Sequence, residues 1–127
     1  MKDVEHQHQA ALVEWFRLQY PKLRPYLFAI PNGGARHIAV ASKLKSEGVL
    51  AGVADLMLAV PKNGFHGMFI EMKAPKGKLS EHQKQWMGEI CLMGYRSIVC
   101  FGVDGAKQEI KNYLSGALDE EPPKTEW

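Results

Sequence analysis

The stretch Gly52–Ala74, which reads GVADLMLAVPKNGFHGMFIEMKA, decides the fold. Two apolar runs, 53–60 and 68–72, flank a segment rich in proline, glycine and asparagine, and this pattern is typical of a β-hairpin. The hairpin also carries charges where core strands normally have none: Asp55, Glu71 and Lys73. Because burying an unpaired charge costs several kcal/mol, charges at these positions indicate a shared task.

Strand geometry predicts that these charges meet. Side chains alternate between the two faces of a strand, so Glu71 and Lys73 share one face. With the turn centred near Gly64, Asp55 is expected roughly opposite Lys73 and diagonal to Glu71, within reach across the strands. The two carboxylates and the carbonyl of Met72 would offer oxygen ligands to a hard divalent cation. The ammonium group of Lys73 could orient a water molecule or offset developing negative charge.

Residues 1–20 have the spacing of an amphipathic helix, which Pro21 ends. Its apolar positions are Val4, Ala11, Leu12, Trp15 and Phe16. Glu5 and Gln9 lie one turn apart on its surface. From residue types alone, Glu5 is an acid in the first turn, where the helix dipole favours negative charge. Gln9 is interpreted as a surface amide or as a group that supports a nearby site.

The segments around the hairpin alternate between strands and helices. A short apolar strand is predicted at 26–30, and a helix at 38–46 that Gly48 ends. A strand at 95–101 precedes a last helix at 105–114, for which Asp104 is the predicted cap. The order is α, β, α, β-hairpin, α, β, α. This order predicts an α/β fold with a mixed central sheet flanked by helices.

The helix after the hairpin begins with a capping box formed by Ser80 and Gln83, and it runs to about Met93. Trp86, Ile90 and Met93 form its apolar stripe, so we expect Trp86 to pack in the core rather than stack on a base. Gln83 is expected to serve the helix as the reciprocal cap.

Length and composition predict one soluble globular domain, with residues 1–115 as its body and 116–127 as a flexible acidic tail. The tail lowers the net charge of the chain to +2, so the body is more basic than the whole and suits a polyanionic partner. No apolar run is long enough for a membrane span, and no signal peptide opens the sequence. Cys91 and Cys100 lack metal or redox spacing, which indicates buried, reduced thiols in the cytoplasm.

Asp55 followed by Glu71-Met72-Lys73 resembles the D…(D/E)-X-K core of the PD-(D/E)XK nuclease superfamily, although Ala54 stands where that motif often has proline. The wider sequence, from about Val4 to Leu114, is similar to the VRR-NUC family in its small stand-alone phage form. The matching segments are Glu5–Gln9, Ile30–Arg36, Gly52–Leu56, Ile70–Lys73 and Leu79-Ser80-x-x-Gln83-x-x-Trp86.

The resemblance implies a fold like that of restriction endonucleases and a Mg²⁺- or Mn²⁺-dependent DNA endonuclease activity, without an organic cofactor. It implies that the metal is held by Asp55, Glu71, the Met72 carbonyl and Glu5. Lys73 would be the catalytic cation. The family often has glutamine at the position of Gln83, beside the metal. We expect that one amide cannot serve as helix cap and site residue at once, and we favour the site.

The resemblance also bears on two segments that suit phosphate contacts. After the strand at 26–30, the glycines of Asn32-Gly33-Gly34 would let backbone amides approach a phosphate, and Arg36 could hold it in a bidentate contact. From residue types alone a tight turn with a solvated arginine is the better interpretation, and the resemblance makes the two readings equal. Lys76 and Lys78 form a basic turn, interpreted either as a solvated connector or as a phosphate contact.

Relatives imply branched DNA as the substrate, in the form of four-way junctions, flaps or splayed ends in phage or bacterial repair and recombination. They also imply a homodimer, whose two-fold symmetry would suit a four-way junction. A non-catalytic nucleic-acid binding module remains the alternative from another class. A restriction-type or RNA-directed nuclease is disfavoured, because no added recognition domain is visible.

Overall fold

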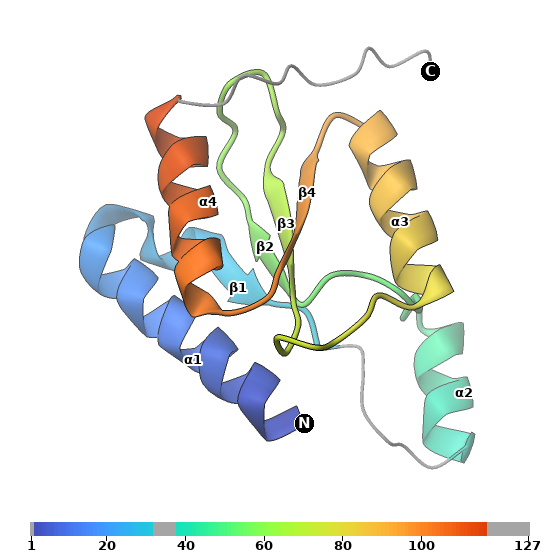
Figure 1. Ribbon diagram of the computed structural model, residues 1–127. Helices are drawn as coiled ribbons and strands as arrows, with labels where there is room; N and C mark the ends of the chain where they lie inside the picture. The colour runs from blue at the N-terminus through green and yellow to red at the C-terminus, as the bar shows by residue number, and fades with distance from the viewer. Residues whose placement is uncertain (1, 32–37, 117–127) are drawn as a thin grey trace.

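The computed structural model describes residues 2–31 and 38–116, which form an α/β fold around one mixed sheet (Figure 1). The elements are α1 (Lys2–Gln19), a 3-10 helix (Pro21–Tyr26), β1 (Leu27–Ala29), α2 (Ile38–Ser46), β2 (Leu56–Leu58), β3 (Met68–Met72), α3 (Glu81–Leu92), β4 (Arg96–Cys100) and α4 (Val103–Ser115). The predicted order of helices and strands is therefore confirmed. The 3-10 helix that opens at Pro21 was not expected.

The sheet has the strand order β1-β2-β3-β4. The first three strands pair antiparallel as a meander, and β4 lies parallel to β3 after the crossover through α3. The predicted mixed sheet is confirmed. Because β3 is a central strand, both of its faces are covered, and every residue from Met68 to Met72 is buried.

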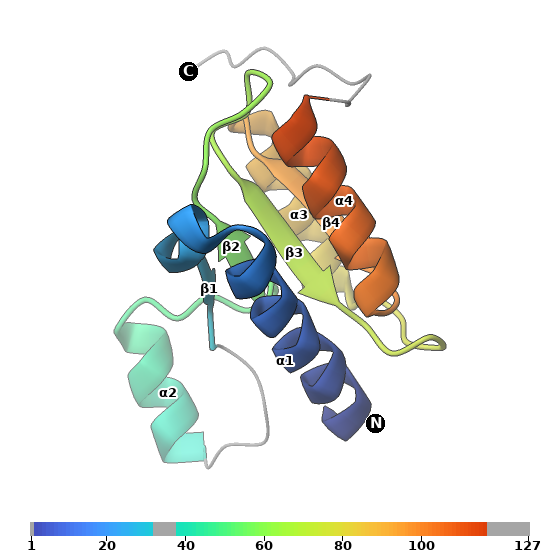
Figure 2. The same cartoon turned by 90° about the vertical axis from the view of Figure 1, so that its left-hand side faces the viewer.

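Helices cover the two faces of the sheet unequally. In Figures 1 and 2, α1 and α4 lie against one face and α3 lies against the other. Met68, Ile70 and Met72 point into the larger core, where they meet Leu12 and Phe16 of α1 and Ile110 and Tyr113 of α4. The apolar prediction for α1 holds at Leu12 and Phe16, whereas Val4 and Ala11 are exposed.

On the other face, the ring of Phe69 meets the ring of Trp86 edge to face, with centroids 4.8 Å apart. Trp86 therefore packs against the sheet, as predicted. None of the residues of α3, all of which the structure describes, is fully buried. The predicted stripe is wrong at Met93, which follows the end of the helix and is exposed. Gly94, at φ +91°, turns the chain there toward β4.

The hairpin has a different register from the predicted one. Its turn lies near Gly64 as expected, because Lys62 bridges Phe65 across Asn63 and Gly64, which both have positive φ. Between this bridge and the strands, however, the first arm holds one more residue than the second, since Leu58 pairs with Met68. Continued by one residue past the pair Leu56–Ile70, this register sets Asp55 opposite Glu71 rather than opposite Lys73.

Helix ends show one confirmed and one wrong prediction. The capping box of α3 is present as predicted: Gln83 N donates to Ser80 Oγ, and Ser80 N donates to Gln83 Oε1. Asp104 does not cap α4, because the helix begins one residue earlier, at Val103, and Asp104 lies inside its first turn. The N–H of Val103 donates instead to Nδ1 of His8, 3.0 Å away on α1.

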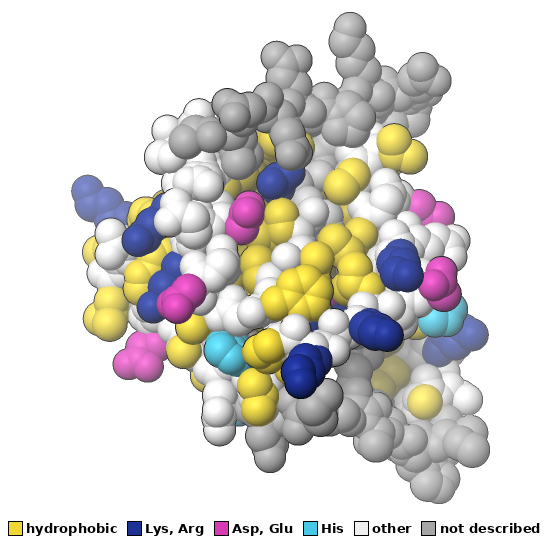
Figure 3. Space-filling model, in the orientation of Figure 1, with side chains coloured by type: hydrophobic (Ala, Val, Ile, Leu, Met, Phe, Trp, Pro, Cys, Tyr) yellow, Lys and Arg dark blue, Asp and Glu magenta, His cyan; other side chains and the backbone are white. Residues whose placement is uncertain are grey.

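Among the described residues, α2 and the surface over the edge strand β4 both face solvent. Figure 2 shows α2 projecting from the body, and Val40 on it is exposed. Figure 3 shows apolar side chains gathered over β4, between α3 and α4.

Among the described residues, no helix combines the length and apolar character needed to cross a membrane. The predicted tail at 116–127 lies outside the described residues except for Gly116.

Both cysteines are free thiols. Cys100 is buried as predicted, and burial raises the pKa of its thiol to about 11. Cys91 is only half-buried, because it lies on α3, which covers its face of the sheet loosely.

Candidate active site

A cleft of about 610 Å³ opens at the end of the sheet where β3 finishes. The first turns of α1 and α3 reach the same end, which is the lower end in Figure 1. All of the side chains predicted to be catalytic line this cleft: Glu5, Asp55, Glu71, Lys73 and Gln83. The structure therefore gathers residues that are as far apart in the chain as α1 and α3.

Asp55 is fixed by the backbone of β3. Its Oδ2 accepts a hydrogen bond of 2.8 Å from the N–H of Met72, so a side chain replaces the next backbone acceptor in the β2–β3 ladder. In a strand, the N–H and C=O of one residue point to the same side. The carbonyl of Met72 therefore points to the same side of β3 as Asp55. It would have to point to this side in order to bind a metal ion together with Asp55.

Glu71 is the buried acid of the site, with only 4% of its surface exposed. Its Oε2 accepts a hydrogen bond from Nε2 of Gln83 at 3.1 Å and lies 3.8 Å from Nζ of Lys73. Burial raises the pKa of Glu71 to about 8, and the negative charge of Asp55 and a hydrogen bond with Asp55 add to the rise. Lys73 opposes this rise, and Glu5 adds to it.

Gln83 makes both of the contacts that were expected to exclude each other. Its Oε1 accepts from the N–H of Ser80 at 2.8 Å, and its Nε2 donates to Glu71. The prediction was wrong because an amide has two chemically different ends, and each end finds its own partner. The cap thus holds the amide in the orientation that presents its nitrogen to Glu71.

Glu5 brings α1 to the edge of the site. Its Oε1 accepts a hydrogen bond of 3.3 Å from the N–H of Ala74, just beyond Lys73. The carboxylate is near enough to Glu71 to raise the pKa of that group. Within the described part of the chain, no three His, Cys, Asp or Glu side chains form a ready-made metal cluster. Asp55 and Glu5 instead accept from backbone N–H groups in this arrangement.

None of the residues predicted to contact DNA is among the described residues that line the cleft. Asn32, Gly33, Gly34 and Arg36 are outside the described residues. Lys76 and Lys78 are exposed in the turn after β3, and neither is among the described residues that line the cleft. Gly77 N donates to Ala74 O at 2.8 Å, which makes this turn a tight reversal beside the site.

Other residues line the cleft that the sequence analysis did not place there. They include His6, His82 and Gly52, together with Gln9, for which a supporting role was left open. Gly52 has φ +92°, and a Cβ atom on it would lie 2.4 Å from the carbonyl oxygen of His82. This contact is possible only for glycine, and it packs the segment before Asp55 onto the first turn of α3. The position of Gly52 three residues before Asp55 was the available signal.

Comparisons with known proteins agree with this geometry. The family model described as VRR-NUC domain matches residues 3–104, a range that includes every residue predicted to be catalytic. A solved structure named "VRR_NUC domain protein" is similar to this chain with a TM-score of 0.78 and 27% sequence identity, and the match covers 88% of each chain. A comparison with curated proteins found no match.

Proposed function

Because the chain belongs to the VRR-NUC domain family, we propose that it is a metal-dependent endonuclease that hydrolyses phosphodiester bonds in DNA. Its fold is of the nuclease type. The observation that carries the proposal is the meeting of Asp55, Glu71 and Lys73 in one cleft, at the start of β2 and the end of the adjacent strand β3. Asp55 also replaces a backbone acceptor of the sheet, but the sheet gains nothing from a second, buried carboxylate, that of Glu71, beside it.

The donor set fits a divalent cation. Asp55 and Glu71 supply carboxylate oxygens, the Met72 carbonyl lies on the same side, and Glu5 is close to both strands. Hard oxygen donors of this kind suit Mg²⁺ and Mn²⁺. The pKa of Glu71 is raised to about 8, first by burial and then by the charge of Asp55, and Lys73 opposes this rise only in part. A bound cation would polarise a phosphoryl oxygen and make a water molecule more acidic.

The residues of the chain have separate tasks in this proposal. Lys73, which is mostly buried beside Glu71, orients the attacking water and stabilises negative charge on the phosphoryl oxygens. Gln83 keeps the carboxylate of Glu71 turned toward Asp55. Glu5 holds the first turn of α1 against the end of β3 and adds an oxygen to the cleft.

We propose branched DNA as the substrate: four-way junctions, flaps or splayed ends that arise in phage or bacterial repair and recombination. The described residues are taken up by the sheet and its helices, which favours reading of backbone shape over reading of base sequence. We also propose that the protein is a homodimer. The exposed apolar strip over the open edge of β4 supports this (Figure 3), and Phe101, which follows β4, is 51% exposed.

One panel of labelled DNA tests the proposal. It contains duplex, flap, splayed-arm, four-way junction and single-stranded substrates, each with Mg²⁺, Mn²⁺ or EDTA. The matched variant is Asp55→Asn, because an asparagine oxygen can still accept from the N–H of Met72. We expect cleavage of branched DNA with either metal, and none with EDTA or with the variant.

Two further readouts separate the alternatives. We expect Mn²⁺ to raise the melting temperature of the wild-type protein and to leave that of Asp55→Asn unchanged. DNA binding without cleavage at any metal concentration would favour the non-catalytic binding module and defeat the proposal. Equal cleavage by wild type and Asp55→Asn would remove the assigned site.

A further inference from the structure

A second hollow adjoins the cleft and continues it along α1. It has a volume of about 480 Å³, and residues of α1 line it: His6, Gln9, Ala10, Val13, Glu14, Arg17 and Leu18. His6 and Gln9 line the cleft as well, so the two hollows meet at these side chains. Together they form one path, which starts at the carboxylates and ends near the C-terminus of α1. We call the part beyond the cleft the α1 groove.

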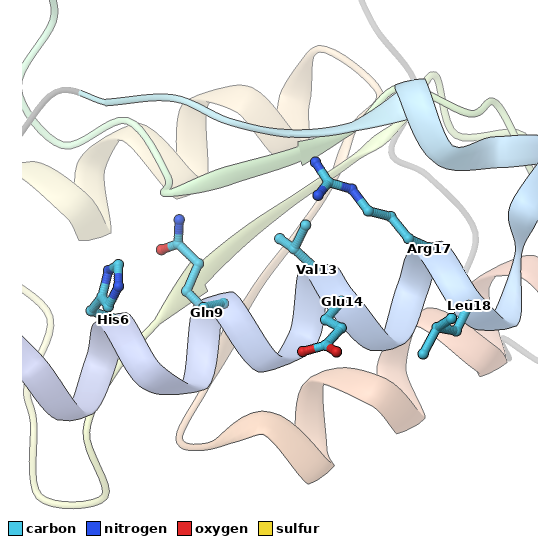
Figure 4. A pocket seen from close by; sticks show the side chains of 7 residues that line it. His6, Gln9, Val13, Glu14, Arg17 and Leu18 are labelled. Carbon is cyan, nitrogen blue, oxygen red and sulfur yellow. The ribbon is translucent and has the colours of Figure 1, made fainter.

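The polar side chains of the α1 groove follow one side of the helix. Figure 4 shows His6, Gln9, Val13 and Arg17 rising from the same side of α1, while Glu14 and Leu18 point away from it. Intervals of three and four residues place side chains in one row along a helix. Arg17, at the far end of this row, is exposed. Glu14 also lines the α1 groove, but its side chain points away from this row, so the row itself has a positive end and no carboxylate.

More positive charge lies beside Arg17. Nε of Arg24 donates a hydrogen bond of 3.0 Å to the carbonyl oxygen of Arg17, which brings a second guanidinium to the end of α1. Lys22 lies in the same 3-10 helix and is exposed. The path therefore runs from the proposed cation site in the cleft to a cluster of basic side chains. Positive charge at both ends would attract a polyanion that lies across the site.

We infer that the α1 groove holds the DNA strand on one side of the scissile phosphate, with its backbone phosphates contacting Arg17 and Arg24. This inference rests on the proposed function. His6 and Gln9 would contact the nearest sugar or phosphate, and Val13 gives an apolar wall against a sugar. Contacts of this kind position a strand without reading its bases.

The length of α1 makes the inference quantitative. At about 1.5 Å per residue, Arg17 lies roughly 18 Å along the helix from Glu5. A duplex strand rises about 3.4 Å per nucleotide while it winds around the axis, so a straight span of this length joins phosphates about three nucleotides apart. A partner protein helix is a poorer fit, because Gln9 and Arg17 interrupt the apolar residues of the groove.

The test uses the full chain and measures binding of labelled duplex arms by fluorescence anisotropy in EDTA, so it does not depend on cleavage. Arg17→Gln is compared with wild type and with Lys62→Gln, an exposed cation at the hairpin turn, on the opposite end of the sheet from the cleft. We expect Arg17→Gln to weaken binding several-fold and to reduce the slope of log affinity against log salt by about 0.9 for each lost phosphate contact. Lys62→Gln should match wild type.

The decisive experiment uses DNA that is shortened on one side of the junction and then on the other. We expect the difference between Arg17→Gln and wild type to vanish when one flank, and only that flank, falls below about three nucleotides. Arg24→Gln should behave as Arg17→Gln does, and it serves as the second variant if thermal melting shows that Arg17→Gln is unfolded. An effect that is equal for all flank lengths, absent, or matched by Lys62→Gln overturns the inference.

The outcome also separates this inference from the proposed function. Flank-dependent binding by a protein that cleaves no DNA would keep the groove and reject the nuclease. Cleavage by the wild type together with full affinity and activity of Arg17→Gln would keep the nuclease and reject the groove.

Discussion

Nε2 of Gln83 lies 3.1 Å from Oε2 of Glu71, and the opposite end of the same amide accepts from the N–H of Ser80. The first turn of α3 and the buried acid of the site are thus joined by one side chain. Helix capping and the orientation of a proposed metal ligand therefore depend on each other, and substitutions can separate the two.

Two substitutions of Gln83 should have different effects on stability and similar effects on activity. Glutamate at this position keeps the oxygen that caps Ser80. It also sets a further carboxylate beside Glu71, so Gln83→Glu should lose stability as the pH rises and both acids ionise. Gln83→Ala should lose about 1 kcal/mol of stability with the cap. Both variants lose the donor to Glu71, and we expect cleavage to fall about 10-fold to 100-fold in both. Thermal unfolding and initial cleavage rates check this.

Gln85→Glu is the matched control, because Gln85 is exposed on α3 and pairs with Glu89 instead of Glu71. It should keep wild-type activity. Full activity of Gln83→Glu would show that the contact with Glu71 serves the helix alone.

The metal-free protein should lose stability as the pH rises, because the pKa of Glu71 is raised from 4.5 to about 8. Between these values the folded state holds a proton that the unfolded state has released. The stabilising contribution is therefore fully present below the lower value and is lost as the pH rises through the upper one. Glu71→Gln should remove this loss and melt at a higher temperature than wild type at pH values above about 8 in EDTA.

Melting curves in EDTA, recorded across this pH window, check the prediction for Glu71. Glu81→Gln removes an exposed acid from α3 and should leave the pH dependence unchanged. Added Mn²⁺ should stabilise the wild type at high pH and not Glu71→Gln. A wild-type melting temperature that stays level up to about pH 9 would contradict the raised pKa.

Lys73→Ala should abolish cleavage while the fold survives. The ammonium group lies 3.8 Å from Glu71 in the cleft, where it would meet the charge that develops on the phosphate. Loss of one such group costs about a hundredfold to a thousandfold in rate. Much of the metal binding should remain, so stabilisation by Mn²⁺ is the second readout. Lys84→Ala, on the exposed side of α3, is the control and should cleave normally. Wild-type rates for Lys73→Ala would defeat its catalytic assignment.

Gly52→Ala should damage the site through the backbone. Its Cβ would lie 2.4 Å from the carbonyl oxygen of His82, so either the segment before Asp55 or the first turn of α3 must move. Gly48→Ala is a matched control, because Gly48 also has positive φ, +103°, but nothing lies within 4 Å of the added atom. Gly48→Ala should cost about 1 kcal/mol, the cost of the strained φ alone. Gly52→Ala should cost clearly more in urea unfolding and lower the cleavage rate, and equal costs for the two variants would refute the close contact.

Local patterns were sufficient to predict most of the fold. The two apolar runs at 53–60 and 68–72, with the turn-rich segment between them, predicted the hairpin. Helical spacing predicted α1, the Gly48 stop signal the end of α2, and the capping box the start of α3. What failed depends on partners that are distant in the chain. The extra residue in the first arm of the hairpin is accommodated because the Val60 carbonyl accepts from the hydroxyl of Tyr113. The start of α4 is satisfied by His8, which no local cap pattern reveals.

The residues of the candidate site could likewise be predicted only in part. Asp55, Glu71 and Lys73 could be predicted from charges on apolar strands, and the family pattern added Glu5 and Gln83. His6 and His82 could not be placed, because the walls of the cleft arise where α1 and α3 pack against the sheet. The double role of Gln83 required the actual orientation of its amide.

The tip of the hairpin is fastened to the last helix by two bonds: the Tyr113 hydroxyl donates to Val60 O at 2.7 Å, and Asn63 Nδ2 donates to Tyr113 O at 2.8 Å. A slip of one residue in strand pairing would turn Asp55 away from Glu71, since side chains alternate between faces. The contacts of Tyr113 at the hairpin turn therefore help to keep Asp55 beside Glu71, although they lie at the other end of the sheet from the cleft. Damage near Tyr113 would therefore abolish the proposed cleavage while every side chain of the candidate site stayed chemically intact.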